Sequence, residues 1–357
     1  LIETYLLLEI NHQSLIATKT NRIVQAANGK PVSDFGARRA HNVDAAVYGA
    51  RAAYIGGAAG TATVLAGKMF HIPISGTMAH SWVMTFDSEY DAFKAYAESY
   101  PDGTVLLVDT YDVLKSGVPN AIRTAREVLE PMGKKLIGIR LDSGDLAYLS
   151  KEARKMLDEA GLPDCMIVAS NSLDEYTISS LNRQGAKIDS YGVGERLITS
   201  SSTPVFGAVY KLVAIQKDGK FIPKIKISET AEKITNPGIK EVYRVYDENG
   251  KAVADYLAVK GEQIQDFEPV RYVDPVNYWK NRSFVGCRFK KLQVPVFEKG
   301  KRIYDLPDIE KIRQYVKDQL ENEIWEEEQR FENAHTHYLD MSPAMFELKM
   351  SLLHEEN

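Results

Sequence analysis

Polar residues of types that can do chemistry stand where the short apolar runs of this chain end. A neutral imidazole nitrogen is a nucleophile near pH 7. Aspartates can hold a metal ion, and exposed backbone N–H groups can hold an anion. In parallel α/β folds, residues at the carboxyl ends of strands meet on one rim. The sequence therefore predicts an active site on that rim, formed by Asp34, Gly76, Thr77, His80, Asp109, Asp142, Ser170, Asn171, Gly192 and Gly194.

Each of these residue types also has a structural interpretation. An isolated histidine two residues before a tryptophan, as His80 is, is more often structural than catalytic. An aspartate after a strand commonly caps the next helix. That interpretation and a catalytic one are equally open for Asp112 and Asp145, whereas Asp109 and Asp142 end apolar runs and should point into the rim.

The elements that would position these residues alternate between short apolar runs and helix-like stretches from about residue 31 to 215. Short buried strands separated by helices of this length are typical of βα units around a parallel sheet or barrel. Six or so units in this length favour one irregular TIM-like α/β barrel over two small domains. The expected strands cover 72–74, 105–108, 136–139 and 166–169, and the expected helices cover 85–99, 112–130, 145–160 and 173–183.

After about residue 208 the pattern changes to the alternation of antiparallel strands. Asp218-Gly219 and Asn249-Gly250 separate alternating runs, which is a strong hairpin signal. We therefore predict a catalytic barrel domain at 1–262 that includes an antiparallel β module at about 208–260. An apolar stripe after residue 305 predicts that 263–357 is the helical part of a second α+β domain.

Composition excludes several classes of protein. The net charge of −5 gives no support for a nucleic-acid partner. Two distant cysteines, Cys165 and Cys287, fit neither a zinc signature nor a disulfide framework and suggest the cytoplasm. No apolar run approaches the roughly 18–20 residues that span a bilayer, so no membrane role is expected. The chain opens at Leu1 inside a helical pattern, from which we expect that preceding residues are missing.

Five segments in order along the chain resemble the nicotinate phosphoribosyltransferase family of type II phosphoribosyltransferases. Each motif is moderately specific, and their joint occurrence is highly specific. The segments are Ser33 to His41, Leu65 to Ser81, Val108 to Asp112 with Ile139 to Asp145, Tyr191 to Arg196 with Val209 to Leu212, and Lys226 to Lys240.

The resemblance implies ATP-assisted transfer of a phosphoribosyl group from phosphoribosyl pyrophosphate to nicotinate, which yields nicotinate mononucleotide for NAD salvage. It implies that ATP phosphorylates His80, that Asp109 lies near that histidine, and that Asp142 lies near the ribose. Mg²⁺ would be held by Asp109 and Asp142. The chain has no Walker motif, so ATP would bind without one.

The resemblance also implies a site for the base and a site for the 5′-phosphate. Guanidinium groups suit a flat aromatic carboxylate because they stack on rings and grip carboxylates through two donors. The alternative is that the arginines are surface charges paired with acids, and the sequence does not decide which arginine would bind the carboxylate. The base site would contain Asp34, Phe35, Arg38, Arg39 and Arg140, and the phosphate site Ser170, Asn171, Gly192 and Gly194.

A homodimer with its active site at the interface is a further implication. A nicotinamide enzyme is the close alternative, and the Arg38-Arg39 pair favours nicotinate over it. A quinolinate enzyme would need a second anionic pocket, and the Gly76-Thr77 to His80-Ser81 motif argues against it. A non-catalytic phosphate-binding barrel is the alternative of another class.

Overall fold

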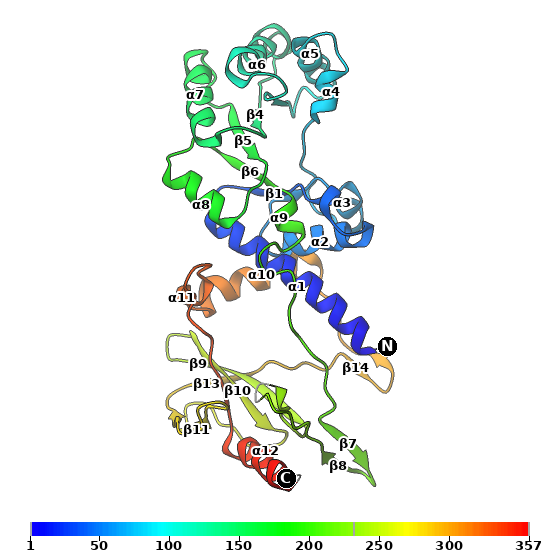
Figure 1. Cartoon of the computed structure of the whole chain (residues 1–357), viewed down its shortest axis with the longest axis vertical. Helices are drawn as coiled ribbons and strands as arrows, with labels where there is room; N and C mark the ends of the chain where they lie inside the picture. The colour runs from blue at the N-terminus through cyan, green and yellow to red at the C-terminus, as the bar shows by residue number, and fades with distance from the viewer. Residues whose placement is uncertain (1, 231–232, 356–357) are drawn as a thin grey trace. The chain divides into compact units, whose positions relative to one another are not determined.

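The computed structural model describes residues 2–230 and 233–355, and the chain divides into two compact units, Leu1–Gly207 and Ala208–Asn357. Each unit has its own six-stranded sheet, shown in Figure 1 with the strands as arrows. Within the described residues, every helix is too short or too polar to cross a membrane.

The first unit is built on a parallel sheet whose strands occur in the order β2-β1-β6-β5-β4-β3. Its ladders are all parallel, and Ile74 adds an isolated parallel bridge to Thr61 of β2. Apolar residues fill both faces, as a parallel sheet requires. The strands are β1 Val32–Asp34, β2 Gly60–Thr61, β3 Val105–Leu107, β4 Gly138–Leu141, β5 Met166–Ser170 and β6 Ser190–Val193.

Helices cover this sheet, and four of them, α2, α5, α7 and α8, begin at a side chain that caps their first turn. Figure 1 shows α7 beside β4 and β5, with which it is in contact. Caps that accept a backbone N–H include Asn42 before α2, Ser88 before α5 and Asp174 before α8. The helices are α1 Ile2–Ala26, α2 Val43–Ile55, α3 Val64–Phe70, α4 His80–Met84, α5 Glu89–Ser99, α6 Val118–Thr124, α7 Leu146–Glu159, α8 Glu175–Arg183 and α9 Glu195–Ile198. Short π and 3₁₀ turns are η1 Ala37–Arg39, η2 Val113–Gly117, η3 Ala125–Leu129 and η4 Glu130–Met132.

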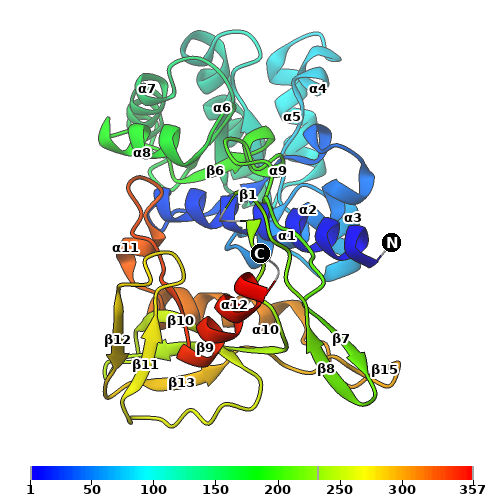
Figure 2. The ribbon, with the colours of Figure 1, turned by 60° about the horizontal axis from the view of Figure 1, so that its bottom comes forward.

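The second unit contains a mixed sheet in the order β12-β11-β16-β10-β9-β13, in which β10 and β16 are the parallel pair. Figure 2 shows α12 beside this sheet, where it packs against β10 and β11. The strands are β7 Ala214–Lys217, β8 Lys220–Pro223, β9 Lys240–Tyr246, β10 Ala252–Val259, β11 Val270–Val273, β12 Asn281–Phe284, β13 Arg288–Lys291, β14 Phe297–Glu298, β15 Lys301–Arg302 and β16 Leu339–Met341. The helices are α10 Ile309–Asp318, α11 Glu326–Gln329 and α12 Pro343–Glu355, with the π turn η6 Gln319–Glu323 after α10.

Both predicted hairpins are present, with different turns. Asp218 and Gly219 have φ of 52° and 76°, so the β7–β8 turn has the two positive φ values of a type I′ turn. Between β9 and β10, Gly250 has a positive φ, whereas the Asp247 carboxylate accepts the N–H groups of Asn249 and Lys251. The longer turn is thus held by a side chain.

The domain boundary differs from the predicted one. The chain divides after Gly207 rather than after residue 262, because β9 and β10 share a sheet with β11, β13 and β16. The part beyond 263 is also not mainly helical, since it contains six strands as well as helices. Alternating α/β order and a parallel sheet are confirmed for the first unit, but within residues 2–207 no ladder joins β2 to β3, so the sheet has two edges.

Candidate active site

A cavity of about 500 Å³ opens at the carboxyl ends of the parallel strands in the first unit. The structure places most of the predicted rim residues around it. Ten of the twelve residues that were assigned a catalytic or binding role from the sequence line it: Phe35, Arg38, Arg39, His80, Arg140, Asp142, Ser170, Asn171, Gly192 and Gly194. Asp34 and Asp109 do not line it and lie buried behind the residues that do.

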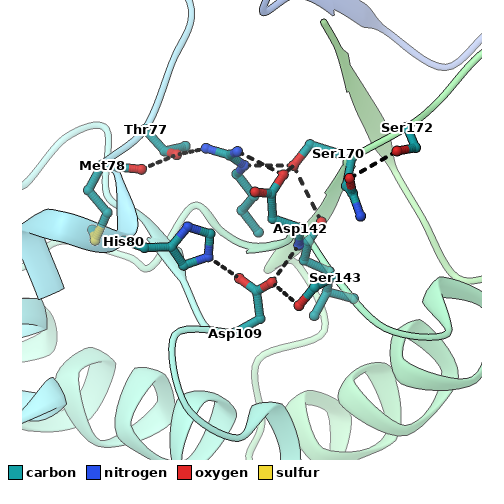
Figure 3. A network of polar contacts seen from close by, with 11 residues as sticks. Thr77, Met78, His80, Asp109, Asp142, Ser143, Ser170 and Ser172 are labelled. Atoms are coloured by element: carbon teal, nitrogen blue, oxygen red, sulfur yellow. Dashed lines mark hydrogen bonds and ion pairs between the residues drawn. The ribbon is translucent and has the colours of Figure 1, made fainter. Parts of the chain in front are cut away.

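His80 and Asp109 form a hydrogen-bonded pair at one side of the cavity (Figure 3). His80 is the first residue of α4, and its Nε2 lies 3.1 Å from Oδ1 of Asp109. The Asp109 carboxylate is 1% exposed, and its Oδ2 accepts the Ser143 hydroxyl at 2.5 Å and the Asp142 N–H at 3.1 Å. Both carboxylate oxygens are thus engaged, and the imidazole has a fixed partner.

Arg140 is the centre of a second polar cluster, whose other members Thr77, Asp142 and Ser170 are labelled in Figure 3. Its Nε donates to Oγ of Ser170 at 2.8 Å, and Nη1 donates to Oγ1 of Thr77 at 2.9 Å. Its Nη2 donates to Oδ1 of Asp142 at 3.0 Å, and the Ser170 hydroxyl donates to the same oxygen. Arg140 is the third residue of β4, and its hydrogen bonds to Thr77, Asp142 and Ser170 fix the plane of its guanidinium group.

Asp34 ties the end of β1 to the end of β2. Its Oδ1 accepts the Gly36 N–H at 2.8 Å and its Oδ2 accepts the Thr61 hydroxyl at 2.7 Å. Burial raises the pKa of the Asp34 carboxyl, although both hydrogen bonds oppose that rise. The residue was predicted to bind the base, but its contacts in the structure hold the Phe35-Gly36 turn.

Arg38 and Arg39 project from the turn η1 and are exposed. Arg39 lies 3.4 Å from the carboxylate of Glu195. In the part of the chain that the structure describes, the Arg38 side chain has neither an ion-pair partner nor a hydrogen-bond partner. The two adjacent arginines therefore differ, because one faces an acid and the other is available.

The predicted phosphate-site residues lie on two neighbouring strands. Ser170 ends β5 and is followed by Asn171 and Ser172, which have φ of 84° and 50°. Gly192 lies inside β6, and Gly194 precedes the short helix α9. All four predicted residues line the cavity and belong to adjacent strand ends, so a single anion could contact several of them.

The capping interpretation is confirmed for Asp112 and Asp145. The Asp112 carboxylate accepts the N–H groups of Leu114 and Lys115, and Asp145 accepts those of Ala147 and Tyr148. Neither residue lines the cavity.

Two residues that hold the site in place were assigned no role from the sequence. Thr77 and Ser143 position Arg140 and Asp109 through their hydroxyl groups. Both stand shortly after strand-like runs, a signal that places them on the rim but does not identify their hydrogen-bond partners.

Asp142 is the acid best placed to contribute to a metal site. Its Oδ1 accepts hydrogen bonds from Arg140 and Ser170, and Asp142 lines the cavity, so Oδ2 is the oxygen that could serve as a metal ligand. Within the described residues, no group of three or more His, Cys, Asp or Glu side chains could hold a metal ion by itself. The protein could supply one carboxylate ligand here, and other ligands would have to come from water or substrate.

Comparison with known proteins agrees with the motifs. A model of the nicotinate phosphoribosyltransferase (NAPRTase) family matches residues 31–250, and one of the C-terminal domain of nicotinate phosphoribosyltransferase matches residues 239–349. The chain is 50% identical over 356 residues to a nicotinate phosphoribosyltransferase of Bacillus subtilis, covering 99% of this chain and 72% of that protein. It is 37% identical to one of Dictyostelium discoideum, covering 97% of this chain and 67% of that protein. The crystal structure of human nicotinic acid phosphoribosyltransferase superposes with a TM-score of 0.82 at 25% identity, over 96% of this chain and 74% of that one.

Proposed function

The chain belongs to the nicotinate phosphoribosyltransferase family, and on this premise we propose that it transfers the phosphoribosyl group of phosphoribosyl pyrophosphate to nicotinate. The C1–O bond to pyrophosphate breaks and a bond forms between C1 and the pyridine nitrogen, giving nicotinate mononucleotide and pyrophosphate. The observation that carries the proposal is the paired cluster of His80–Asp109 and Arg140–Asp142 in one cavity.

The proposed chemistry places most of the catalytic effect in positioning and electrostatics. The ribose carries positive charge as the C1–O bond breaks, and no covalent bond to the protein is needed. Asp142 supplies a negative charge at the cavity wall, with Arg140 and Ser170 fixing its position. Asp142 would also provide the protein's ligand to Mg²⁺, an ion that neutralises the departing pyrophosphate.

We assign the ATP-dependent step to Nδ1 of His80. Asp109 accepts hydrogen bonds at both oxygens, which favours the proton on Nε2 and a lone pair on Nδ1. Nδ1 attacks the γ-phosphorus of ATP and ADP leaves; water later cleaves the phosphohistidine to release phosphate. Phosphorylation adds negative charge to His80 beside the place where pyrophosphate would bind. The affinity of the protein for pyrophosphate would therefore differ between the phosphorylated and the unphosphorylated state.

Arg38 is the arginine that we assign to the nicotinate carboxylate. Arg140 already donates to three protein acceptors, and Arg39 faces Glu195. Arg38 has an unpaired guanidinium group at the same cavity, within the described residues. Ser170, Asn171, Gly192 and Gly194 remain our proposal for the wall that meets the 5′-phosphate.

Three wider predictions are kept as proposals. The strand order corresponds to a barrel that is open between β2 and β3, which supports the irregular TIM-like description. The exposed apolar residues Ile2, Tyr5 and Leu8 on α1 support a homodimer. Two free buried thiols support a reducing compartment, the cytoplasm.

The test is product formation from phosphoribosyl pyrophosphate and Mg²⁺ with nicotinate, nicotinamide or quinolinate, with and without ATP, read by mass. We expect nicotinate mononucleotide, formed faster with ATP, and no ATP hydrolysis by His80→Ala. Product from nicotinamide alone would overturn the substrate assignment. Absence of product from every base would favour the non-catalytic alternative.

Matched variants of the two adjacent arginines test the carboxylate assignment. Losing a charge-assisted hydrogen bond costs about 1.5–3 kcal/mol, so Arg38→Ala should raise the KM for nicotinate by roughly 10- to 150-fold. Arg39→Ala should change it much less, because that side chain already faces Glu195. The reverse order would move the assignment to Arg39.

A further inference from the structure

Gly192 occupies a position inside the parallel sheet rather than in the loop that follows it. It is buried in β6, and it pairs in register with Ser33 of β1 and Ser170 of β5. A residue held on both sides by strand ladders has a fixed backbone. The reason for glycine here must therefore lie in the space that a side chain would take.

That space is filled by the ring of Phe35. A Cβ atom on Gly192 would lie 2.3 Å from Cε2 and 2.4 Å from Cδ2 of this ring, far inside ordinary contact distance. The backbone of Phe35 cannot easily move away, because its N–H donates to the Val193 carbonyl at 2.8 Å. Asp34 holds the following turn through the Gly36 N–H.

The ring of Phe35 is in turn in contact with Arg140. The Cζ atom of Arg140 lies 5.3 Å from the ring centroid, within the range of a cation–π contact. Phe35 and Arg140 both line the cavity. The missing side chain of Gly192 thus sets where the ring lies, and the ring supports one face of the guanidinium group.

We propose that Gly192 is a positioning residue for the base, which acts by giving the Phe35 ring its place beside Arg140. This inference rests on the proposed function, because it takes the flat base to bind at these two side chains. It gives Gly192 a steric role in place of a contact with the 5′-phosphate, which is left to Ser170, Asn171 and Gly194. The two roles predict different kinetic effects of one added methyl group.

A methyl group at position 192 would push the ring of Phe35 away by about 1 Å. A displacement of that size in an active site can reduce activity by up to roughly 100-fold. We therefore expect Gly192→Ala to raise the KM for nicotinate by roughly 10- to 100-fold, with the KM for phosphoribosyl pyrophosphate changed less than about threefold. A phosphate-binding role predicts the opposite result, a raised KM for phosphoribosyl pyrophosphate and a nearly unchanged KM for nicotinate. Gly138→Ala is the matched control, because its Cβ would meet the Met166 carbonyl oxygen at 2.8 Å in the same sheet, at the start of β4.

The decisive experiment is a double-mutant cycle with Phe35→Ala. If Gly192 acts through the ring, Gly192→Ala should have less than about a twofold effect on either KM once the ring is removed. It should also lower the melting temperature in the presence of Phe35 and much less in its absence. A raised KM for phosphoribosyl pyrophosphate in the Phe35→Ala background, or equal loss of melting temperature in both backgrounds, would overturn the proposal.

The cycle also separates this inference from the proposed function. An inactive wild-type chain would count against phosphoribosyl transfer, whereas the melting temperatures would still decide whether the ring rests on Gly192. If Gly192→Ala alone does not fold, Phe35→Ala and the double variant suffice. Equal melting temperatures and equal KM values in those two proteins support the steric role, and a difference between them contradicts it.

Discussion

Replacing Asp109 by Asn tests whether this carboxylate sets the tautomer of His80. Its Oδ2 accepts the N–H of Asp142 at 3.1 Å and the hydroxyl of Ser143 at 2.5 Å. Its Oδ1 faces Nε2 of His80 at 3.1 Å. An ionised carboxylate has acceptors at both oxygens, so the neutral imidazole carries its proton on Nε2.

The orientation of the new amide follows from these contacts. The Asn oxygen should take the Oδ2 position, because the reverse orientation sets the amide NH₂ against the Asp142 N–H. A buried donor without an acceptor costs about 1–3 kcal/mol, which is enough to select one orientation. The NH₂ group then faces His80, whose Nε2 must accept, and the imidazole proton moves to Nδ1.

The expected result is the loss of the ATP effect with little loss of the transfer itself. A catalytic histidine held in the wrong tautomer can lose on the order of 10⁴-fold in rate, so we expect the rate at which ATP phosphorylates His80 to fall by roughly 10²- to 10⁴-fold. Transfer without ATP should change less than about threefold, because Asp142 and Arg140 keep their contacts. The assay is nicotinate mononucleotide formation with and without ATP, with mass spectrometry of the peptide that contains His80.

Ser143→Ala is the matched control, since it removes one donor to Asp109 and leaves the carboxylate. It should reduce the rate of His80 phosphorylation by less than about tenfold, the effect of one hydrogen bond. Full ATP stimulation and normal phosphohistidine in Asp109→Asn would refute the tautomer argument. An equal loss of transfer with and without ATP would instead indicate that Asp109 acts directly on the phosphoribosyl group.

Two further predictions concern stability and pH. Burial raises the pKa of the Glu89 carboxyl, although the hydrogen bond from Asn120 opposes the rise, so the charge of Glu89 destabilises the fold increasingly as pH rises from about 4.5 through the folded-state pKa. The melting temperature of Glu89→Gln, measured relative to wild type, should therefore be higher at pH 7.5 than at pH 4.5. A difference that stays constant with pH would contradict this prediction. Contacts with Asp255 at 3.4 Å and Glu328 at 3.0 Å raise the pKa of His337 above 6.5, although burial opposes the rise. The stabilisation that the charged His337 contributes is complete below about pH 6.5 and is lost as pH rises through the folded-state pKa. His337→Gln should therefore show a smaller change of melting temperature with pH than wild type between roughly pH 6 and 8. An unchanged pH dependence in this range would count against the prediction.

The site residues that could be predicted from the sequence are those that stand at the ends of neighbouring strands. Asp109 and Asp142 follow neighbouring strands, and parallel pairing of β3 with β4 brings them together. The hydroxyl partners were not predictable in this way. Thr77 reaches Arg140 across 63 positions of sequence, and its hydrogen bond depends on side-chain direction rather than on any periodic pattern.

The second unit was predicted less well for a related reason. β9 and β10 are joined by a local hairpin, and alternation with a turn signal was sufficient to find them. β16 is a three-residue strand, Leu339–Met341, that pairs in parallel with β10 far earlier in the chain. A strand this short shows no clear alternation, so its identity is fixed by its partner and not by its own sequence. The domain boundary was misplaced because the sheet depends on such distant pairings.

Arg140 and Arg38 both line the cavity, but their positions in the fold suit them to different tasks. Arg140 stands in a strand, where neighbouring segments bring Thr77, Ser170 and Asp142 within hydrogen-bond distance. With three donors engaged it can present one fixed surface, but it has few donors left for a ligand. Arg38 stands on an exposed turn and has no acceptor within the described residues, so its guanidinium group keeps its full capacity to bind an anion. Selection of the base by charge should therefore depend on the turn, while its orientation depends on the strands.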